Sequence, residues 1–149
     1  MTYTSTKHFN HEVGLSCCFR QWRASSHCRF LHGYALAVTL DFAATELDKN
    51  GWVQDFGGLK DVKQFLVEAF DHKTMVAHDD PDIAHFDNLN KKGIIQMRLV
   101  QGTGCEAFAR MIGENVQMVL RAAAQPQRVT LTRCTVAEHG SNSASWIPA

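Results

Sequence analysis

The sequence has no excess of charge, no long apolar run and little proline. Its fifteen lysines and arginines balance fifteen aspartates and glutamates over 149 residues, which argues against a protein that binds nucleic acid or a membrane surface. No apolar run approaches the ~20 residues of a membrane-spanning helix, and Met1–Asn10 is too polar for a secretory signal. We therefore expect one soluble, cytoplasmic domain over residues 1–149, without nucleic-acid or membrane partners.

The spacing of a disulfide framework or a zinc finger is also missing. The five cysteines form an odd count, are scattered along the chain and include no Cys-x-x-Cys pair. Without an export signal, such cysteines are typical of free thiols or metal ligands. They are Cys17, Cys18, Cys28, Cys105 and Cys134.

Alternation of apolar and polar residues predicts several strands. Tyr34–Phe42 places every second residue, all of them large and apolar, on one face, which is typical of a half-buried strand. The turn signal Asn50-Gly51 precedes a returning strand at Trp52–Phe56. Further strands are expected within residues 1–15, at Ile94–Val100, and at Val129–Ala137 after Gln125-Pro126.

Two segments have helical spacing instead. Apolar residues recur every three or four positions over Leu59–Phe70 and over Phe108–Leu120, which predicts two amphipathic helices. Thr103 and Glu106 fit a capping box before the second helix, and residues 73–93 are polar enough to predict a long loop. This order indicates an α+β domain, an antiparallel sheet with two helices on one face. Because such a sheet leaves open edges, we expect several copies to assemble through them.

The densest group of reactive side chains lies between Ser26 and Tyr34, where two imidazoles and a thiol fall within six residues. Histidine and cysteine bind zinc and move protons near neutral pH. A set such as Cys17, His27 and His32 would supply the three protein ligands of a catalytic zinc ion. The alternative is a polar loop beside core cysteines, and spacing alone favours neither.

Three further positions carry candidate chemistry. Asp71 beside His72 can orient the imidazole for general acid–base work, although such a pair at a helix end is more often a cap. Glu138, at the end of the last strand, can accept two N–H bonds from a pterin or guanine ring, or can be a solvated strand end. Backbone N–H groups around Thr103, at a helix N-terminus, offer a cradle for an anion or ligand.

Taken together, these motifs resemble the 6-pyruvoyl-tetrahydropterin synthase and 6-carboxy-tetrahydropterin synthase family. The matching parts run through nearly the whole chain and are Cys28-x-x-Leu31-His32-Gly33, Trp52-Val53-Gln54-Asp55-Phe56 with Leu59-Lys60, Phe70-Asp71-His72, Glu106 and Glu138. The resemblance implies the tunnelling fold, in which a four-stranded antiparallel sheet carries two helices. It also implies hexameric rings with active sites between subunits.

The same resemblance implies a role for each matching residue. Cys28 is expected to be the catalytic thiol, Asp71 with His72 the proton relay, and Glu138 the anchor of the pterin ring. The implied zinc-dependent lyase converts 7,8-dihydroneopterin triphosphate by metal-assisted proton transfer and triphosphate elimination. In the carboxy branch, acetaldehyde is then lost on the route to queuosine and other deazapurines. Other expected substrate-binding residues are Thr103 and Glu106.

The chain departs from the family pattern at the expected metal site. The family has His-Gly-His where this chain has His32-Gly33-Tyr34, and a further family histidine falls at Cys17 or Cys18. Tyrosine is a poor zinc ligand because its phenol, with a reference pKa of about 10, is protonated near pH 7. We therefore expect Cys17, His27 and His32 to bind the zinc ion.

Two other functions are compatible with the sequence. A catalytically silent homologue that binds a pterin or purine would need Glu138 but none of Cys28, Asp71 and His72. A related synthase could act on another pterin, because one fold hosts several reactions.

Overall fold

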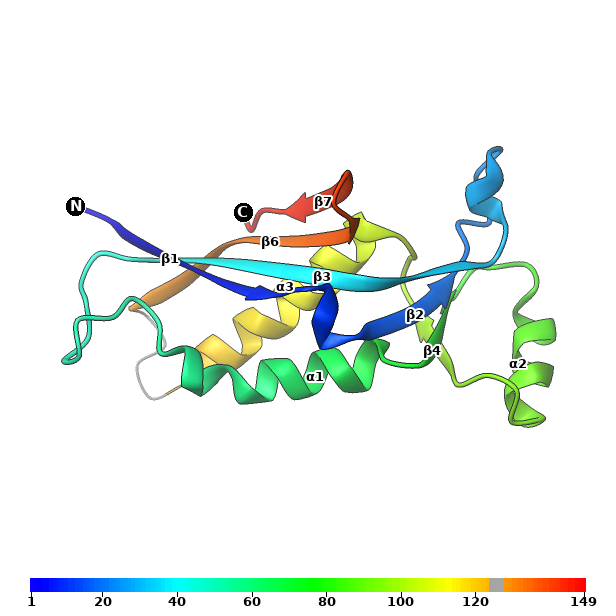
Figure 1. Cartoon of the computed structure of the whole chain (residues 1–149), viewed down its shortest axis with the longest axis horizontal. Coiled ribbons are helices and arrows are strands. Elements are labelled where there is room, and N and C mark those ends of the chain that lie inside the picture. The colour runs from blue at the N-terminus through cyan, green and yellow to red at the C-terminus, as the bar shows by residue number, and fades with distance from the viewer. Residues whose placement is uncertain (124–127) are drawn as a thin grey trace.

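The computed structural model describes residues 1–123 and 128–149, which form one sheet and three α-helices (Figure 1). Short 3-10 turns lie at His11–Val13, His27–Arg29 and Phe56–Leu59. The helices are α1 (Lys60–Phe70), α2 (Ile83–Lys91) and α3 (Cys105–Ala122). The strands are β1 (Tyr3–Phe9), β2 (Leu15–Phe19), β3 (His32–Ala44), β4 (Lys73–Ala77), β5 (Met97–Val100), β6 (Val129–His139) and β7 (Asn142–Trp146).

The 13-residue strand β3 organises the sheet. Both β1 and β2 pair with β3 along one edge, and β6 pairs along the other. A 3-10 turn ending at Gly14, whose φ is 77°, separates β1 from β2. The pairings among β1, β2, β3, β6 and β7 are antiparallel, whereas β4 pairs with β2, and β5 with β4, in parallel. The observed sheet is therefore mixed and seven-stranded, and the expected four-stranded antiparallel sheet is wrong in this respect.

The strand at Tyr34–Phe42 and the helices at Leu59–Phe70 and Phe108–Leu120 are confirmed within β3, α1 and α3. Residues 73–93, expected to be a loop, instead contain β4 and α2. Thr74–Ala77 is buried at every position of a strand that is paired at both edges, so it lacks the alternation that marks a half-exposed strand. The predicted strands at Ile94–Val100 and Val129–Ala137 are found as β5 and β6, and the Gln125-Pro126 turn lies outside the described residues.

The strand predicted at Trp52–Phe56 is wrong. Asp48 accepts hydrogen bonds from the backbone N–H groups of Asn50 and Trp52, at 2.8 and 2.9 Å, and this local bonding stabilises a turn. The Arg128 guanidinium then donates to the carbonyl oxygens of Glu46, Trp52 and Val53. Because side chains satisfy these backbone groups, the segment needs no partner strand.

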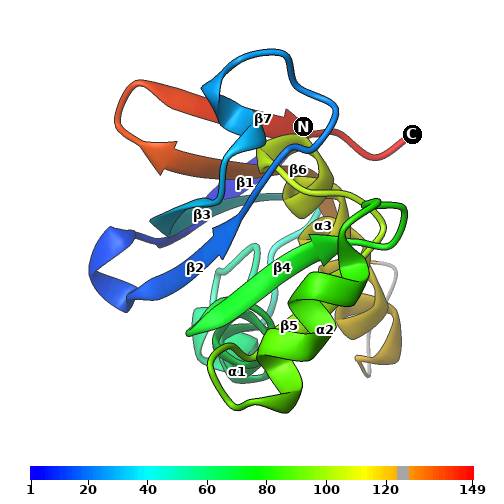
Figure 2. The same ribbon diagram turned by 90° about the vertical axis from the view of Figure 1, so that its right-hand side faces the viewer.

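Helices α1 and α3 run along the sheet, while α2 lies beside β4 and β5 at one end (Figures 1 and 2). The fully buried ring of Phe108, on α3, joins the layers by packing 5.2 Å from Phe19 and 5.3 Å from Phe70. Gly113 lets Trp146 of β7 approach α3, because a Cβ atom at this position would overlap the indole ring. None of the described helices combines the length and apolar character needed to cross a bilayer.

A partly buried ion-pair network joins the segment after β2 to the segment after β4. Arg20 donates to both carboxylate oxygens of Asp80, at 2.9 and 2.6 Å, and to Asp82 at 2.6 Å. The side chain of Asp80 is only 1% exposed. The hydrogen bonds from Arg20 hold the pKa of Asp80 below its usual range, so this carboxylate is ionised at neutral pH.

Asp80→Asn should destabilise the protein at neutral pH by about 3 kcal/mol, because it breaks a pair that is buried on the carboxylate side. In the wild type, the depressed pKa means that Asp80 contributes stability above its unfolded pKa of about 3.9. That contribution is lost as the pH falls through the folded pKa. Urea unfolding should therefore show a large difference between the two proteins at neutral pH and a small one in acid.

Asp79→Asn is the matched control, because Asp79 forms a more exposed pair with Arg23. Its effect at neutral pH should be much smaller than that of Asp80→Asn, because solvent screens the exposed pair. A difference for Asp80→Asn that is as large in acid as at neutral pH would contradict this account of the network.

Candidate active site

Pairing of β2 with β3 places four residues on one face of the sheet. Cys17 lies opposite Tyr34, and Phe19 lies opposite His32. The rings of Phe19 and His32 are 4.9 Å apart, and those of His32 and Tyr34 are 5.5 Å apart. Gly33 allows this pairing, because a Cβ atom there would lie 2.5 Å from the Cys17 carbonyl oxygen. The His-Gly-Tyr motif therefore needs its glycine for strand contact.

The phenol of Tyr34 lies where three negative or ionisable groups converge. Burial and then the charge of Glu138 raise the pKa of Tyr34, with smaller contributions from Cys28 and Cys105. The ring of His139 is 6.0 Å from the Tyr34 ring. Tyr34 thus keeps its proton at neutral pH and can donate a hydrogen bond, which suits it poorly to bind a metal ion.

Cys105 also lies near Tyr34 and Glu138, although no sequence motif predicted a role for it. It begins α3, receives a backbone hydrogen bond from Glu138, and has a pKa that burial raises to about 11. Burial likewise raises the pKa of Cys17 to about 12, with a further contribution from Cys105. The only sequence signal for Cys105 was its position directly before Glu106. Both thiols are protonated at neutral pH.

Cys28 lies on the 3-10 turn His27–Arg29, at the rim of this cluster. The Ser26 hydroxyl accepts from the Cys28 N–H at 3.4 Å, and the Cys28 carbonyl accepts from the N–H of Gln21 at 2.9 Å. Cys28 is partly exposed and His27 is exposed on the same turn. The turn therefore presents the thiol at the surface while fixing its backbone.

The Asp71–His72 pair is formed, but it lies in a different place. Asp71 Oδ1 is 2.7 Å from His72 Nδ1, and the His72 side chain is 85% exposed. The His72 N–H donates to the Ser16 carbonyl at 2.7 Å, and His72 has a φ of 56°, in the left-handed region. The carboxylate can thus orient the imidazole, as expected from the sequence.

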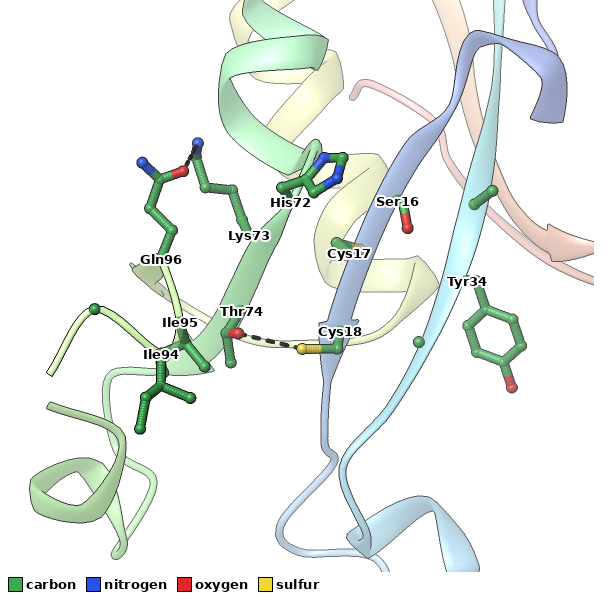
Figure 3. A pocket seen from close by; sticks show the side chains of 13 residues that line it. Ser16, Cys17, Cys18, Tyr34, His72, Lys73, Thr74, Ile94, Ile95 and Gln96 are labelled. Carbon is green, nitrogen blue, oxygen red and sulfur yellow. Dashed lines mark hydrogen bonds between the residues drawn. The ribbon is translucent and has the colours of Figure 1, made fainter. Parts of the chain in front are cut away.

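His72 lines an open groove of about 850 Å³ whose walls come from β2, β3, β4 and residues 93–96 (Figure 3). Its walls include Ser16 and Cys18, which alternate along β2 with the buried Cys17, so the groove opens on the side away from α1 and α3. Cys18 and Thr74 face each other at 3.2 Å, and Tyr34 points away from them. The other lining residues are Gly33, Ala35, Lys73, Gly93, Ile94, Ile95 and Gln96.

One chain therefore divides the expected catalytic residues between two sites. Cys28 and Glu138 both act electrostatically on Tyr34, whereas His72, which is hydrogen-bonded to Asp71, lines the groove. Among the described residues, no hydrogen bond or ion pair joins His72 to Cys28.

Thr103 and Glu106, expected to bind substrate and to cap α3, make other contacts in the structure. The Thr103 hydroxyl donates to the Arg20 carbonyl at 2.7 Å, so it is already occupied within the chain. The capping box is wrong, because Gly104, with a φ of 104°, occupies the cap and no side chain bonds to the first turn. Glu106 lies in that first turn, next to the Cys105 thiol.

The expected zinc ligands are only partly assembled. Cys17 and His32 share a face, and His32 Nδ1 bonds to the Phe30 carbonyl at 2.7 Å, which leaves Nε2 available, as in many metal sites. His27 lies on the exposed turn. Within the described part of the chain, no three His, Cys, Asp or Glu residues are placed to hold a metal ion. The set does not fit a three-ligand zinc centre.

Comparison with known proteins gives a consistent family. The sequence model described as 6-pyruvoyl tetrahydropterin synthase matches residues 8–147. A 6-carboxy-5,6,7,8-tetrahydropterin synthase from Rickettsia felis is 42% identical over 57 residues, which are 38% of this chain and 41% of that protein. The Rickettsia typhi protein of the same name is 36% identical over 73 residues, 48% of this chain and 53% of that protein. The matches thus span about half of these relatives or less.

Solved structures agree in fold along the whole chain. An uncharacterised protein from Wolinella succinogenes superposes with a TM-score of 0.81 at 20% identity, covering 100% of this chain and 99% of that one. A catalytic-residue mutant of Plasmodium vivax 6-pyruvoyltetrahydropterin synthase gives 0.72 at 14% identity, covering 98% and 97%. At these identities the likeness establishes the fold alone.

Tyr34→His should raise the affinity for zinc, because it adds an imidazole opposite Cys17 and beside His32. We expect a gain of at least roughly tenfold, or about 1.4 kcal/mol. Competition with a chromogenic zinc chelator measures this affinity without any need for turnover. Tyr34→Phe is the matched control, since it removes the hydroxyl and adds no donor. Equal zinc affinities for the two variants would contradict the inferred geometry.

Proposed function

Because the chain belongs to the 6-pyruvoyl tetrahydropterin synthase family, we propose that it is a pterin synthase of the lyase type. Its proposed substrate is 7,8-dihydroneopterin triphosphate, and its proposed product is 6-carboxy-5,6,7,8-tetrahydropterin, a precursor of queuosine and other deazapurines. The Rickettsia relatives that carry the 6-carboxy-tetrahydropterin synthase name support this branch of the family.

The observation that carries the proposal is the approach of the strand end with Glu138 and His139 to Tyr34, whose ring lies 6.0 Å from the His139 ring. Glu138 and, more weakly, Cys28 also raise the pKa of Tyr34. A carboxylate can accept two parallel N–H bonds from the amino group and the adjacent ring nitrogen of a pterin. Tyr34, which keeps its proton, can donate to an oxygen of the same ligand. In the proposed complex, the Cys28 thiol acts on the side chain that the ring carries.

The chemistry follows from these positions. Cys28, as a thiolate, removes a proton from a carbon of the substrate side chain, and His72 returns a proton to the carbon skeleton. Asp71 holds His72 Nδ1 at 2.7 Å, which fixes the ring tautomer and leaves Nε2 to exchange the proton. Triphosphate leaves by elimination. One water molecule then adds to the side-chain carbon next to the ring, and cleavage of the bond from this carbon to the next releases acetaldehyde and leaves the carboxylated pterin.

The separation of His72 from Cys28 within one chain supports an active site built between subunits. In the proposed assembly, the groove beside His72 receives the Cys28 turn of a neighbouring copy. Open edges for assembly are available, because β5 and β7 end the sheet and an unpaired edge favours pairing with another strand. We propose a ring-shaped homo-oligomer, a hexamer, with sites that need two copies.

A silent pterin- or purine-binding homologue is the second candidate, favoured by the incomplete zinc ligand set. It would keep Glu138 as the ring anchor and would show no turnover. The preserved Asp71–His72 hydrogen bond argues against it, since a binder needs no oriented imidazole. A synthase acting on another pterin would form product without releasing acetaldehyde.

Incubation with 7,8-dihydroneopterin triphosphate should release acetaldehyde and 6-carboxytetrahydropterin, measured by mass spectrometry. Cys28→Ala should lower kcat by at least roughly 1,000-fold, because it removes the proposed base, while ligand binding is kept. Cys134→Ala, which removes a thiol buried between the sheet and α3, is the control and should turn over substrate. Binding of the pterin without any turnover by the wild type would favour the silent homologue.

Mixing two inactive variants tests the shared site. Cys28→Ala and His72→Ala subunits, unfolded and reassembled together in equal amounts, should regain about a quarter of wild-type activity, because random assembly forms that share of intact pairs. The matched control is each variant reassembled alone, which should stay inactive. Absence of any recovery in co-assembled oligomers would place Cys28 and His72 in the same subunit's site.

A further inference from the structure

The segment that carries Cys28 is anchored to the body of the protein through Arg20. The guanidinium makes a two-pronged bond to Asp80 and a third bond to Asp82, with N–O distances of 2.9, 2.6 and 2.6 Å. It also lies 5.8 Å from the centre of the Phe86 ring, on α2. Two-pronged pairs of this kind fix both distance and orientation, so Arg20 is held rigidly against the connection between β4 and α2.

Backbone groups at Arg20 and Gln21 bond to two further segments, the start of α3 and the Cys28 turn. The Arg20 carbonyl accepts from the Thr103 hydroxyl at 2.7 Å, just before α3. The next N–H along the chain, from Gln21, donates to the Cys28 carbonyl at 2.9 Å. The side chain of Gln21 packs over Gly104, where a Cβ atom would lie 2.5 Å from Nε2. Arg20 thus connects the Cys28 turn, the start of α3 and the segment after β4.

We propose that Arg20 is a positioning residue, which holds the Cys28 thiol in place relative to the start of α3. The inference rests on the proposed function, in which Cys28 is the base, and names a residue outside the reacting groups that this chemistry requires. Arg20 touches neither Cys28 nor the cluster around Tyr34 through its side chain. It acts by fixing the backbone that Cys28 is bonded to.

Arg23 provides a matched control on the same two segments. It pairs with Asp79 at 2.6 Å, but its side chain is 68% exposed and stacks on Trp22, 4.2 Å from the ring centre. An exposed pair of this kind contributes little to rigidity. Arg23→Ala therefore removes the same charge from the same loop without removing the buried anchor.

The test is the rate at which iodoacetamide alkylates Cys28, followed by peptide mass spectrometry at a fixed neutral pH. Cys134, which is fully buried between the sheet and α3 and is not among the residues that line the groove, is the internal reference. Arg20→Ala should raise the Cys28 rate severalfold, because local opening exposes the partly covered thiol more often, and should leave the Cys134 rate within about twofold. Arg23→Ala should match the wild type at both cysteines.

Rescue by a conservative variant separates positioning from folding. Arg20→Lys keeps the charge but has no two-pronged donor, so its Cys28 alkylation rate should fall between wild type and Arg20→Ala. If turnover is observed, Arg20→Ala should lower kcat by roughly 100-fold, the loss expected from a misplaced reacting group, with a smaller effect on KM. If Arg20→Ala does not fold, the Cys28 alkylation rates of Arg20→Lys and Asp82→Asn test the positioning role instead. Asp82→Asn removes only the more exposed of the two ion pairs of Arg20.

A Cys28 alkylation rate that is the same in folded Arg20→Lys, Asp82→Asn, Arg23→Ala and wild type would overturn the proposal. Equal rises at Cys134 and Cys28 would also overturn it, since they would indicate general loosening of the fold. A selective rise at Cys28 in a protein that turns over no pterin would support the positioning role and reject the proposed function.

Discussion

The structure depends on the shared pairing of β3. Its thirteen residues pair with β1 and β2 along one edge and with β6 along the other. Every second side chain of its C-terminal part is buried beneath α1 and α3, so the same alternation that forms the sheet also forms the core. The candidate site lies at the other end of β3, where burial becomes incomplete at His32 and Tyr34.

This position explains the protonation of the site. At the end of the core, side chains are buried enough to lose part of their hydration, and little water lies between them to screen their charges from one another. The pKa values of Tyr34, Cys17 and Cys105 are all raised, with burial as the largest cause. The cluster therefore offers neutral donors beside the carboxylate of Glu138. Neutral donors beside a carboxylate are complementary to a ligand that carries both N–H groups and carbonyl oxygens.

The sequence predicted the parts of the fold whose periodicity reflects a single buried face. A single buried face is found in four elements whose patterns were correctly interpreted, namely β3, α1, α3 and β6. β4 was missed because it is buried on both sides, and the segment at Trp52–Phe56 was misread because Asp48 and Arg128 satisfy its backbone. At the site, short motifs identified the Asp71–His72 pair. No local pattern could show that His72 lines the groove, away from Cys28 and Glu138, or that Cys105 lies next to Glu138.

At position 72, the backbone conformation favours glycine, whereas the hydrogen bond to Asp71 requires a side chain. A φ of 56° suits glycine, and an L-residue held there is strained by about 1 kcal/mol. Glycine would relieve that strain and would also erase the imidazole that Asp71 orients. Selection for thermostability alone would therefore be expected to drift toward glycine or asparagine at this position, while selection for turnover would retain histidine. The residue found at position 72 in a set of laboratory-evolved variants would thus record which of the two pressures had acted.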